Sequence, residues 1–183
     1  YEELKLFGHN LLHATLAYLG ARRQLHYIWE SLDDPSVRPV FNSVADEAGS
    51  ALQKKHAFPP GEVTQYMDEL TIRFGNRLLG DTIARVARDP LRKLGPDDRL
   101  IGGIRLCLSQ GIRPQAICLV TAACLCYNNP EDPGSQKLQS FLREHGVEYV
   151  LSHICQLSDG GARALVLQYY KEICHESSPF KRY

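Results

Sequence analysis

The sequence predicts an all-α fold, and three observations support this prediction. Apolar residues recur mostly at three- and four-residue spacing, which is the spacing of one helical face. We find no clear run of alternating apolar and polar residues of the kind that forms an exposed strand. Glycine and proline stand between the periodic segments, where helices begin and end. We therefore expect one multi-helix domain over residues 1–183.

The first half of the chain divides into four expected helices and a broken segment. The first helix runs from about residue 2 to Leu19 and stops near Gly20, and a short second helix covers 22–30. A third begins at Asp34, a capping residue with Pro35 at the first helical position, and runs toward Lys55. The segment AFPPGE ends it, and the fourth helix carries VTQYMDELTIRF. Glycine and proline break residues 75–96 into short helical pieces.

The second half predicts five further helices. Their expected ranges are 98–110, 114–127, 134–145, 146–157 and 160–174. The segment NNPEDPGS is expected to form a loop, and the tail ESSPFKRY is expected to be frayed or loosely docked.

The composition is that of a soluble globular protein, with 44% apolar and 23% charged residues. Lysine plus arginine (21) balance aspartate plus glutamate (21), so the charge indicates neither nucleic acid nor a membrane as partner. No apolar run is long enough to span a bilayer, no signal peptide is evident, and we expect a cytoplasmic protein. The six cysteines form no C-x-x-C pair and mostly stand among apolar residues, so we expect reduced core thiols rather than zinc ligands or disulfides.

The first helix carries an unusual polar face within KLFGHNLLHATLAYLG. At about 100° per residue, four polar residues share one side of this helix: Lys5, His9, Asn10 and His13. A solvated face is one interpretation. A metal pair at His9 and His13 is another, but an adjacent glutamate and a third ligand are lacking. Proton chemistry is the third, because a lysine held partly out of water has a lowered pKa and can accept a proton.

The spacing of three of these residues resembles a family motif. Lys5, Asn10 and His13 match K-x-x-x-x-N-x-x-H of the polyol-specific long-chain dehydrogenases, the mannitol dehydrogenase family, and the surrounding residues are especially similar to its mannitol-1-phosphate 5-dehydrogenase branch. The resemblance implies that Lys5 is the general acid/base and that Asn10 and His13 bind and polarise the reacting oxygen. His9 lies outside the motif and is expected to be a structural or rim residue.

A second stretch, RFGNRLLGDTIARVARDPLRKLGPDDRLIG, is similar to the same branch. The slightly longer segment from Arg73 to Arg105 holds eight basic and four acidic residues, which suits an anionic substrate. The resemblance favours Arg85 and Lys93 for substrate contact, and Arg88 and Arg92 are further candidates for holding phosphate. The alternative is salt bridging with four aspartates: Asp81, Asp89, Asp97 and Asp98. Arg99 is expected to be structural.

Nearly the whole chain resembles only the helical C-terminal domain of this family. Family members carry an N-terminal Rossmann domain, but this chain has no G-x-G-x-x-G after a strand, so the Rossmann partner and most of the NAD site are expected outside it. The implied function is NAD-dependent, metal-free oxidation of a hexitol phosphate, such as mannitol 1-phosphate, to a ketose phosphate, with the isolated chain inactive. The alternative is a helical binding or scaffold domain without dehydrogenase activity.

Overall fold

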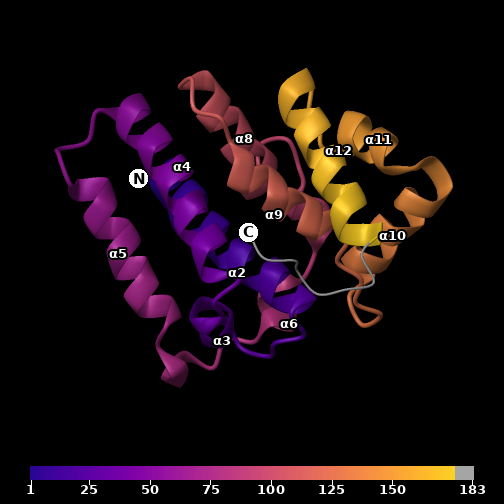
Figure 1. Ribbon diagram of the computed structural model, residues 1–183, viewed down its shortest axis with the longest axis horizontal. Helices are drawn as coiled ribbons and strands as arrows, with labels where there is room; N and C mark the ends of the chain where they lie inside the picture. Colours follow the sequence, from indigo (N-terminus) through magenta and orange to yellow (C-terminus); the bar gives the residue numbers. More distant parts are fainter. Residues whose placement is uncertain (176–183) are drawn as a thin grey trace.

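The computed structural model describes residues 1–175 and confirms the all-α prediction. Every regular element among these residues is a helix, and the extended backbone pairs only at an isolated antiparallel bridge between Tyr27 and Thr82. Figure 1 shows α2 and α4 in the middle of the molecule, α5 at one edge, and α10, α11 and α12 at the opposite edge. The expectation for the tail ESSPFKRY concerns residues 176–183, which lie outside the described residues.

The N-terminal helix is longer and less regular than expected. It comprises α1 (Glu2–Leu4), the π-helix η1 (Lys5–Asn10) and α2 (Leu11–Arg22), which follow one another without a break. Gly20 does not end the helix. Its lack of a side chain allows close packing instead, because a Cβ there would clash with Ser31 and Ile83. A π-helix has i→i+5 hydrogen bonds and a wider turn, so the projection at 100° per residue does not hold through η1.

Helix α2 forms the centre of the core. Its contacts are with α3, α6, α9 and α4, and seven of its apolar side chains are fully buried: Leu11, Leu12, Ala14, Leu16, Ala17, Tyr18 and Leu19. At 25 cal/mol per Å² of apolar surface removed from water, each of the larger side chains contributes about 1.5–3 kcal/mol.

The short second helix was predicted too early. Residues 23–27 are not helical, and α3 spans Ile28–Asp33. The Ile28 amide donates to the Asp81 carbonyl (3.0 Å), and the Ile83 amide donates to the His26 carbonyl (2.8 Å). Backbone pairing with a distant segment therefore replaces the local helix, which begins only after Tyr27, where the Glu30 side chain caps it.

The third helix begins later than predicted. Asp34 accepts hydrogen bonds from the amides of Ser36 and Val37, but these close a turn at 35–37, and α4 spans Arg38–His56 with Pro39 in its first turn. Helix α5 (Glu62–Phe74) follows the proline pair as expected. The broken segment 75–96 contains η2 (Arg77–Leu79), α6 (Ile83–Ala87) and α7 (Pro90–Lys93), and it passes over α2, where the Tyr18 hydroxyl donates to the Ala87 carbonyl (2.9 Å).

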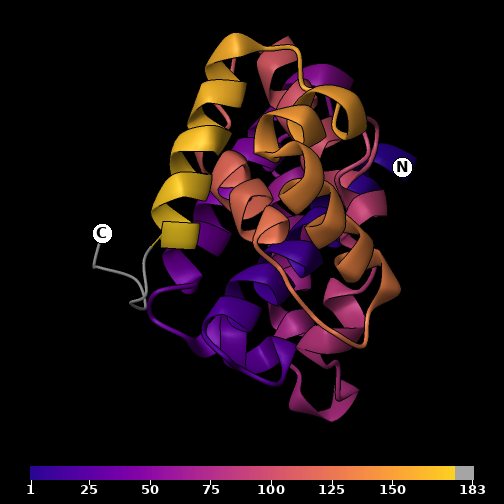
Figure 2. The same ribbon diagram turned by 90° about the vertical axis from the view of Figure 1, so that its right-hand side faces the viewer.

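The C-terminal helices lie close to the expected ranges. They are α8 (Arg99–Ser109), α9 (Gln115–Leu125), α10 (Pro133–His145), α11 (Val147–Tyr149), the π-helix η3 (Val150–Ile154) and α12 (Gly160–His175). Helix α9 packs on α12, α8, α2 and α4 and is almost entirely buried. The view in Figure 2 shows α12 along one side of the molecule and α10 and α11 facing the reader. None of the described helices is long and apolar enough to cross a bilayer.

The prediction for the cysteines was right for four residues and wrong for two. Four thiols are free and buried: Cys107, Cys118, Cys124 and Cys155. Cys126 and Cys174 instead form a disulfide, with Cα atoms 6.4 Å apart. Cys126 caps the C-terminus of α9, and Cys174 lies in the last turn of α12 beside it. The two are 48 residues apart in the sequence, so only the packing of these helices brings them together.

Candidate active site

The N-terminal helix carries the three motif residues in different environments. Lys5 opens η1 with an exposed side chain, and its amine makes no hydrogen bond or ion pair within residues 1–175. Asn10 ends η1 and His13 lies in the first turn of α2, and both are partly buried. The structure thus partly buries the amide and the imidazole and leaves the amine at the surface.

His13 is held by aromatic contacts and stays neutral. Its ring stacks on Phe74 at 4.9 Å between centroids and meets the His9 ring edge-on at 5.4 Å. Burial, assisted by His9, lowers the pKa of His13 to about 4. Nε2 lies 3.3 Å from Oδ2 of Asp81 but without hydrogen-bond geometry, so this buried nitrogen has no hydrogen-bond partner among the described residues. His13 therefore presents an unused polar atom at neutral pH.

His9 contacts Asn10 directly. Its Nδ1 lies 3.2 Å from Oδ1 of Asn10, and burial lowers the pKa of His9 as well. If Nδ1 carries the proton, it donates to Oδ1 and leaves the Asn10 amino group free to donate elsewhere. This contact agrees with the expected structural role of His9.

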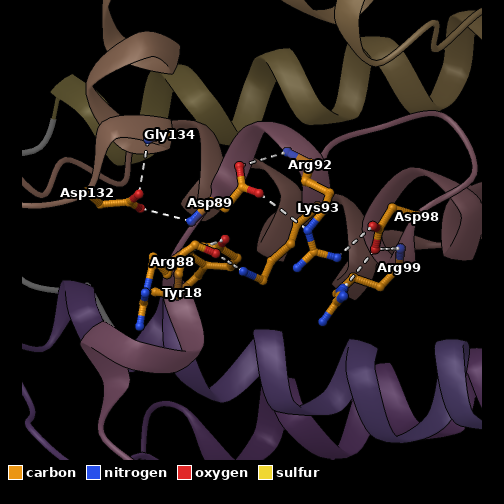
Figure 3. Close-up of polar contacts among 10 residues, drawn as sticks. Tyr18, Arg88, Asp89, Arg92, Lys93, Asp98, Arg99, Asp132 and Gly134 are labelled. Carbon is orange, nitrogen blue, oxygen red and sulfur yellow. Dashed lines mark hydrogen bonds and ion pairs between the residues drawn. The ribbon is translucent and has the colours of Figure 1, made fainter.

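Of the candidate phosphate-binding residues, Lys93 is the one whose side chain is buried. Only 4% of the residue is exposed, and its Nζ donates to the Arg88 carbonyl, as Figure 3 shows. Burial, and then the positive charge of Arg99, lower the pKa of Lys93 to about 8. A buried ammonium with one carbonyl acceptor has two further N–H donors, which is a costly arrangement for a purely structural residue.

The three candidate arginines are exposed, and two of them form salt bridges. Arg85 pairs with Asp81. Arg92 lies between Asp89 (3.3 Å) and Asp98 (3.4 Å) and ties α7 to the start of α8, as Figure 3 shows. The alternative of salt bridging is thus confirmed for these two residues, although it does not exclude ligand contact.

Arg88 and Arg99, also in this segment, have different environments. The Arg88 side chain is exposed, although its carbonyl receives Lys93. Arg99 pairs with Asp98 at 2.8 Å, which agrees with its expected structural role. Its charge also lowers the pKa of His9, His13 and Lys93, so Arg99 lies close to both groups of candidate residues.

Sequence reasoning missed two residues of the site. Phe74, at the end of α5, covers both histidine rings, and Asp81 faces His13 from the loop before α6. Asp81 was expected only as a partner of surface arginines. Neither contact has a local signal, because each joins residues more than 60 positions apart in the sequence.

The site is open in this chain. A groove of about 550 Å³ lies between α4 and α5, and a second of about 350 Å³ lies beside η1 and α8, but Lys5, Asn10 and His13 line neither. No group of three or more histidine, cysteine, aspartate or glutamate side chains within residues 1–175 is arranged to hold a metal ion. Asn10 and His13 are thus two neutral polar groups on one helix, and Asp81 lies between His13 and Arg85 of the basic segment.

Residues 1–159 match the mannitol dehydrogenase C-terminal domain. The chain belongs to the mannitol dehydrogenase family. It is 38% identical over 177 residues to the mannitol-1-phosphate 5-dehydrogenase of Exiguobacterium sp., covering 96% of this chain and 46% of that protein. The enzyme of the same name from Thermoanaerobacter pseudethanolicus is 36% identical over 174 residues, covering 94% of this chain and 45% of that protein.

A solved structure supports the fold assignment. The mannitol 2-dehydrogenase of Pseudomonas fluorescens, in a ternary complex with NAD and D-mannitol, superposes with a TM-score of 0.77 at 22% identity. The match covers 96% of this chain and 38% of that one. This mannitol dehydrogenase family domain therefore spans less than half the length of the relatives it matches.

Proposed function

We propose that this chain is the substrate-binding and catalytic domain of an NAD-dependent mannitol-1-phosphate 5-dehydrogenase that oxidises mannitol 1-phosphate to fructose 6-phosphate. The observation that carries the proposal is His13, a buried neutral imidazole with an unpartnered Nε2, next to Asn10 and on the same helix as Lys5. The relatives named mannitol-1-phosphate 5-dehydrogenase support this choice of substrate.

No dinucleotide site of the glycine-rich kind is formed by residues 1–175. No described segment combines a strand with a glycine-rich turn, and the glycine pair 102–103 lies inside α8. We therefore place the cofactor on the other part of the parent protein, where NAD, when bound, accepts the hydride.

In this proposal Lys5 acts as the base. Its neutral amine takes the hydroxyl proton of the hexitol as the carbon–oxygen bond becomes a carbonyl. The exposed position of Lys5 at the start of η1 leaves the amine accessible to a substrate bound against this face. The cofactor-bearing part of the parent would then cover the amine and exclude water.

Asn10 and His13 steady the oxygen on which negative charge develops. Each supplies a neutral N–H donor that is fixed before the reaction, Asn10 through its contact with His9 and His13 through its stack on Phe74. A neutral donor suits this role, because an imidazolium would pass its proton to the alkoxide that Lys5 must create.

Lys93 and Arg85 hold the phosphorylated end of the substrate. Lys93 is buried close to Arg99. Its two remaining N–H donors would be satisfied by a ligand with strong hydrogen-bond acceptors, such as a phosphate. Arg85 is exposed and oriented by Asp81, and Arg88 and Arg92 lie nearby as weaker candidates.

Steady-state kinetics of the parent protein test this function. We expect NADH formation from mannitol 1-phosphate and far less from mannitol. The Lys93→Met variant should raise KM for the phosphorylated substrate by about 10–100-fold, the worth of one or two hydrogen bonds to a charged group. Lys54→Met is the matched control, because the Lys54 amine donates to the Gln110 carbonyl at an exposed site. A parent that forms no NADH from either hexitol would contradict the proposal.

A further inference from the structure

The Asp81 side chain lies between His13 of the N-terminal helix and Arg85 of the basic segment. One of its carboxylate oxygens, Oδ2, is 3.3 Å from Nε2 of His13, and the other, Oδ1, pairs with Arg85. Its carbonyl accepts the Ile28 amide at 3.0 Å, within the backbone pairing that joins residues 26–28 to 81–83. The carboxylate is therefore presented to His13 from a fixed backbone rather than from a free loop.

The contact with Asp81 influences which ring nitrogen of His13 carries the proton. His9, Arg85 and Arg99 disfavour a charged imidazole, whereas Asp81 favours it. Burial has the largest effect on the pKa of His13, so the imidazole remains neutral. A neutral imidazole carries its proton on either Nδ1 or Nε2. A lone pair on Nε2 would face the carboxylate and be repelled, whereas a proton on Nε2 would be attracted. Asp81 therefore favours the tautomer with the proton on Nε2.

We propose that Asp81 is a positioning residue, which keeps His13 as an Nε2–H donor toward the substrate oxygen and at the same time orients Arg85 for the substrate. The inference rests on the proposed function, and it joins the two groups of candidate residues through one side chain. The poor hydrogen-bond geometry matters here, because it leaves the Nε2–H unsatisfied and able to donate to a substrate oxygen that reaches it.

Nitrogen-15 NMR of His13 in this chain tests the tautomer without any activity assay. We expect Nε2–H in the wild type near pH 7. In Asp81→Asn the amide can donate to Nε2, so the proton should move to Nδ1 in most molecules. Asp81→Glu keeps a carboxylate and should retain Nε2–H. Asp33→Asn is the matched control, because Asp33 pairs with Arg77 at 3.5 Å on the exposed surface. An unchanged His13 tautomer in Asp81→Asn would overturn the inference.

Kinetics of the parent supply the second readout. Asp81→Asn should lower kcat by about 10²–10³-fold, the usual loss for one oxyanion donor, whereas Asp33→Asn should not change kcat. Because Asp81 also holds Arg85, KM for the phosphorylated substrate should rise in the same variant. An active parent whose kcat is unaffected by Asp81→Asn would also overturn the inference. If the parent has no polyol activity but the tautomer still depends on Asp81, the proposed function fails and the positioning stands.

Discussion

At the scale of single residues, the burial of the candidate side chains differs from what the sequence led us to expect. The spacing of Lys5, Asn10 and His13 was visible in the sequence, and a family resemblance gave the three residues their expected roles. Their burial was not visible. Lys5, expected to be partly out of water, is exposed in this chain, whereas His13 is 14% exposed under Phe74.

Lys93 shows the same limit of sequence reasoning. It lies in the basic stretch PLRKLGP and was expected to contact substrate, yet its side chain is buried and donates to the Arg88 carbonyl. Sequence spacing gave no warning, because the helix that carries Lys93 is only four residues long and its orientation is set by Asp89 and Asp132. Long-range packing, rather than local pattern, decides which charges are buried.

The neutrality of His13 predicts a pH dependence of stability. The folded pKa of about 4 lies below the ordinary value of 6.5, so between these values the unfolded chain binds a proton that the native chain does not. Lowering the pH from 7 to 5 should therefore cost the wild type about 2 kcal/mol that a His13→Gln variant does not lose. Urea unfolding of both proteins at the two pH values measures the difference. Equal losses in both proteins would show that His13 titrates normally.

At the scale of elements, the helices of the C-terminal half followed the sequence closely, because proline, glycine and capping aspartates mark their ends. Asp98 and Asp132 both cap helices that were expected. The errors fall where tertiary contacts override local preference, as at residues 23–27, where backbone pairing with 81–83 replaces a helix. The π-turn of η1 was also missed, since the apolar spacing through it still fits an ordinary helix.

The disulfide between α9 and α12 gives a prediction at this scale. Closing a loop of 48 residues restricts the unfolded chain, so the Cys126–Cys174 bond should stabilise the fold by about 2–4 kcal/mol. Urea unfolding with and without dithiothreitol measures this difference. Cys174→Ser is the control, because reductant should then have no effect on the midpoint. Under oxidising conditions four thiols, not six, should react in denaturant. Six reactive thiols would mean that this pair is reduced in solution.

At the scale of the whole molecule, we propose that the chain supplies one side of a site. The Lys5 amine is exposed at the surface, and the relatives are about twice as long as this chain. The fold class was predictable, because helical spacing runs through the chain. The contact between the N-terminal helix and the basic segment was not predictable. It is made by Asp81 and Phe74, which contact His13 from more than 60 residues away in the sequence.

The most direct test of the central claim is the pH profile of kcat for Lys5→Ala in the parent protein. Removal of a general base should lower kcat by roughly two to four orders of magnitude. In the wild type, the oxidation rate should rise with pH as the amine loses its proton, and this limb should vanish in the variant. Small added amines should restore part of the rate.

The control variant is Lys55→Ala, whose amine pairs with Glu3 at 2.7 Å on the surface beside the same helix. We expect it to keep the kcat and the pH profile of the wild type. Asn10→Ala and His13→Ala should lower kcat but retain the limb, because they steady the oxygen and do not take its proton. A Lys5→Ala enzyme with near wild-type kcat and an unchanged pH profile would contradict the assignment of Lys5 as the base.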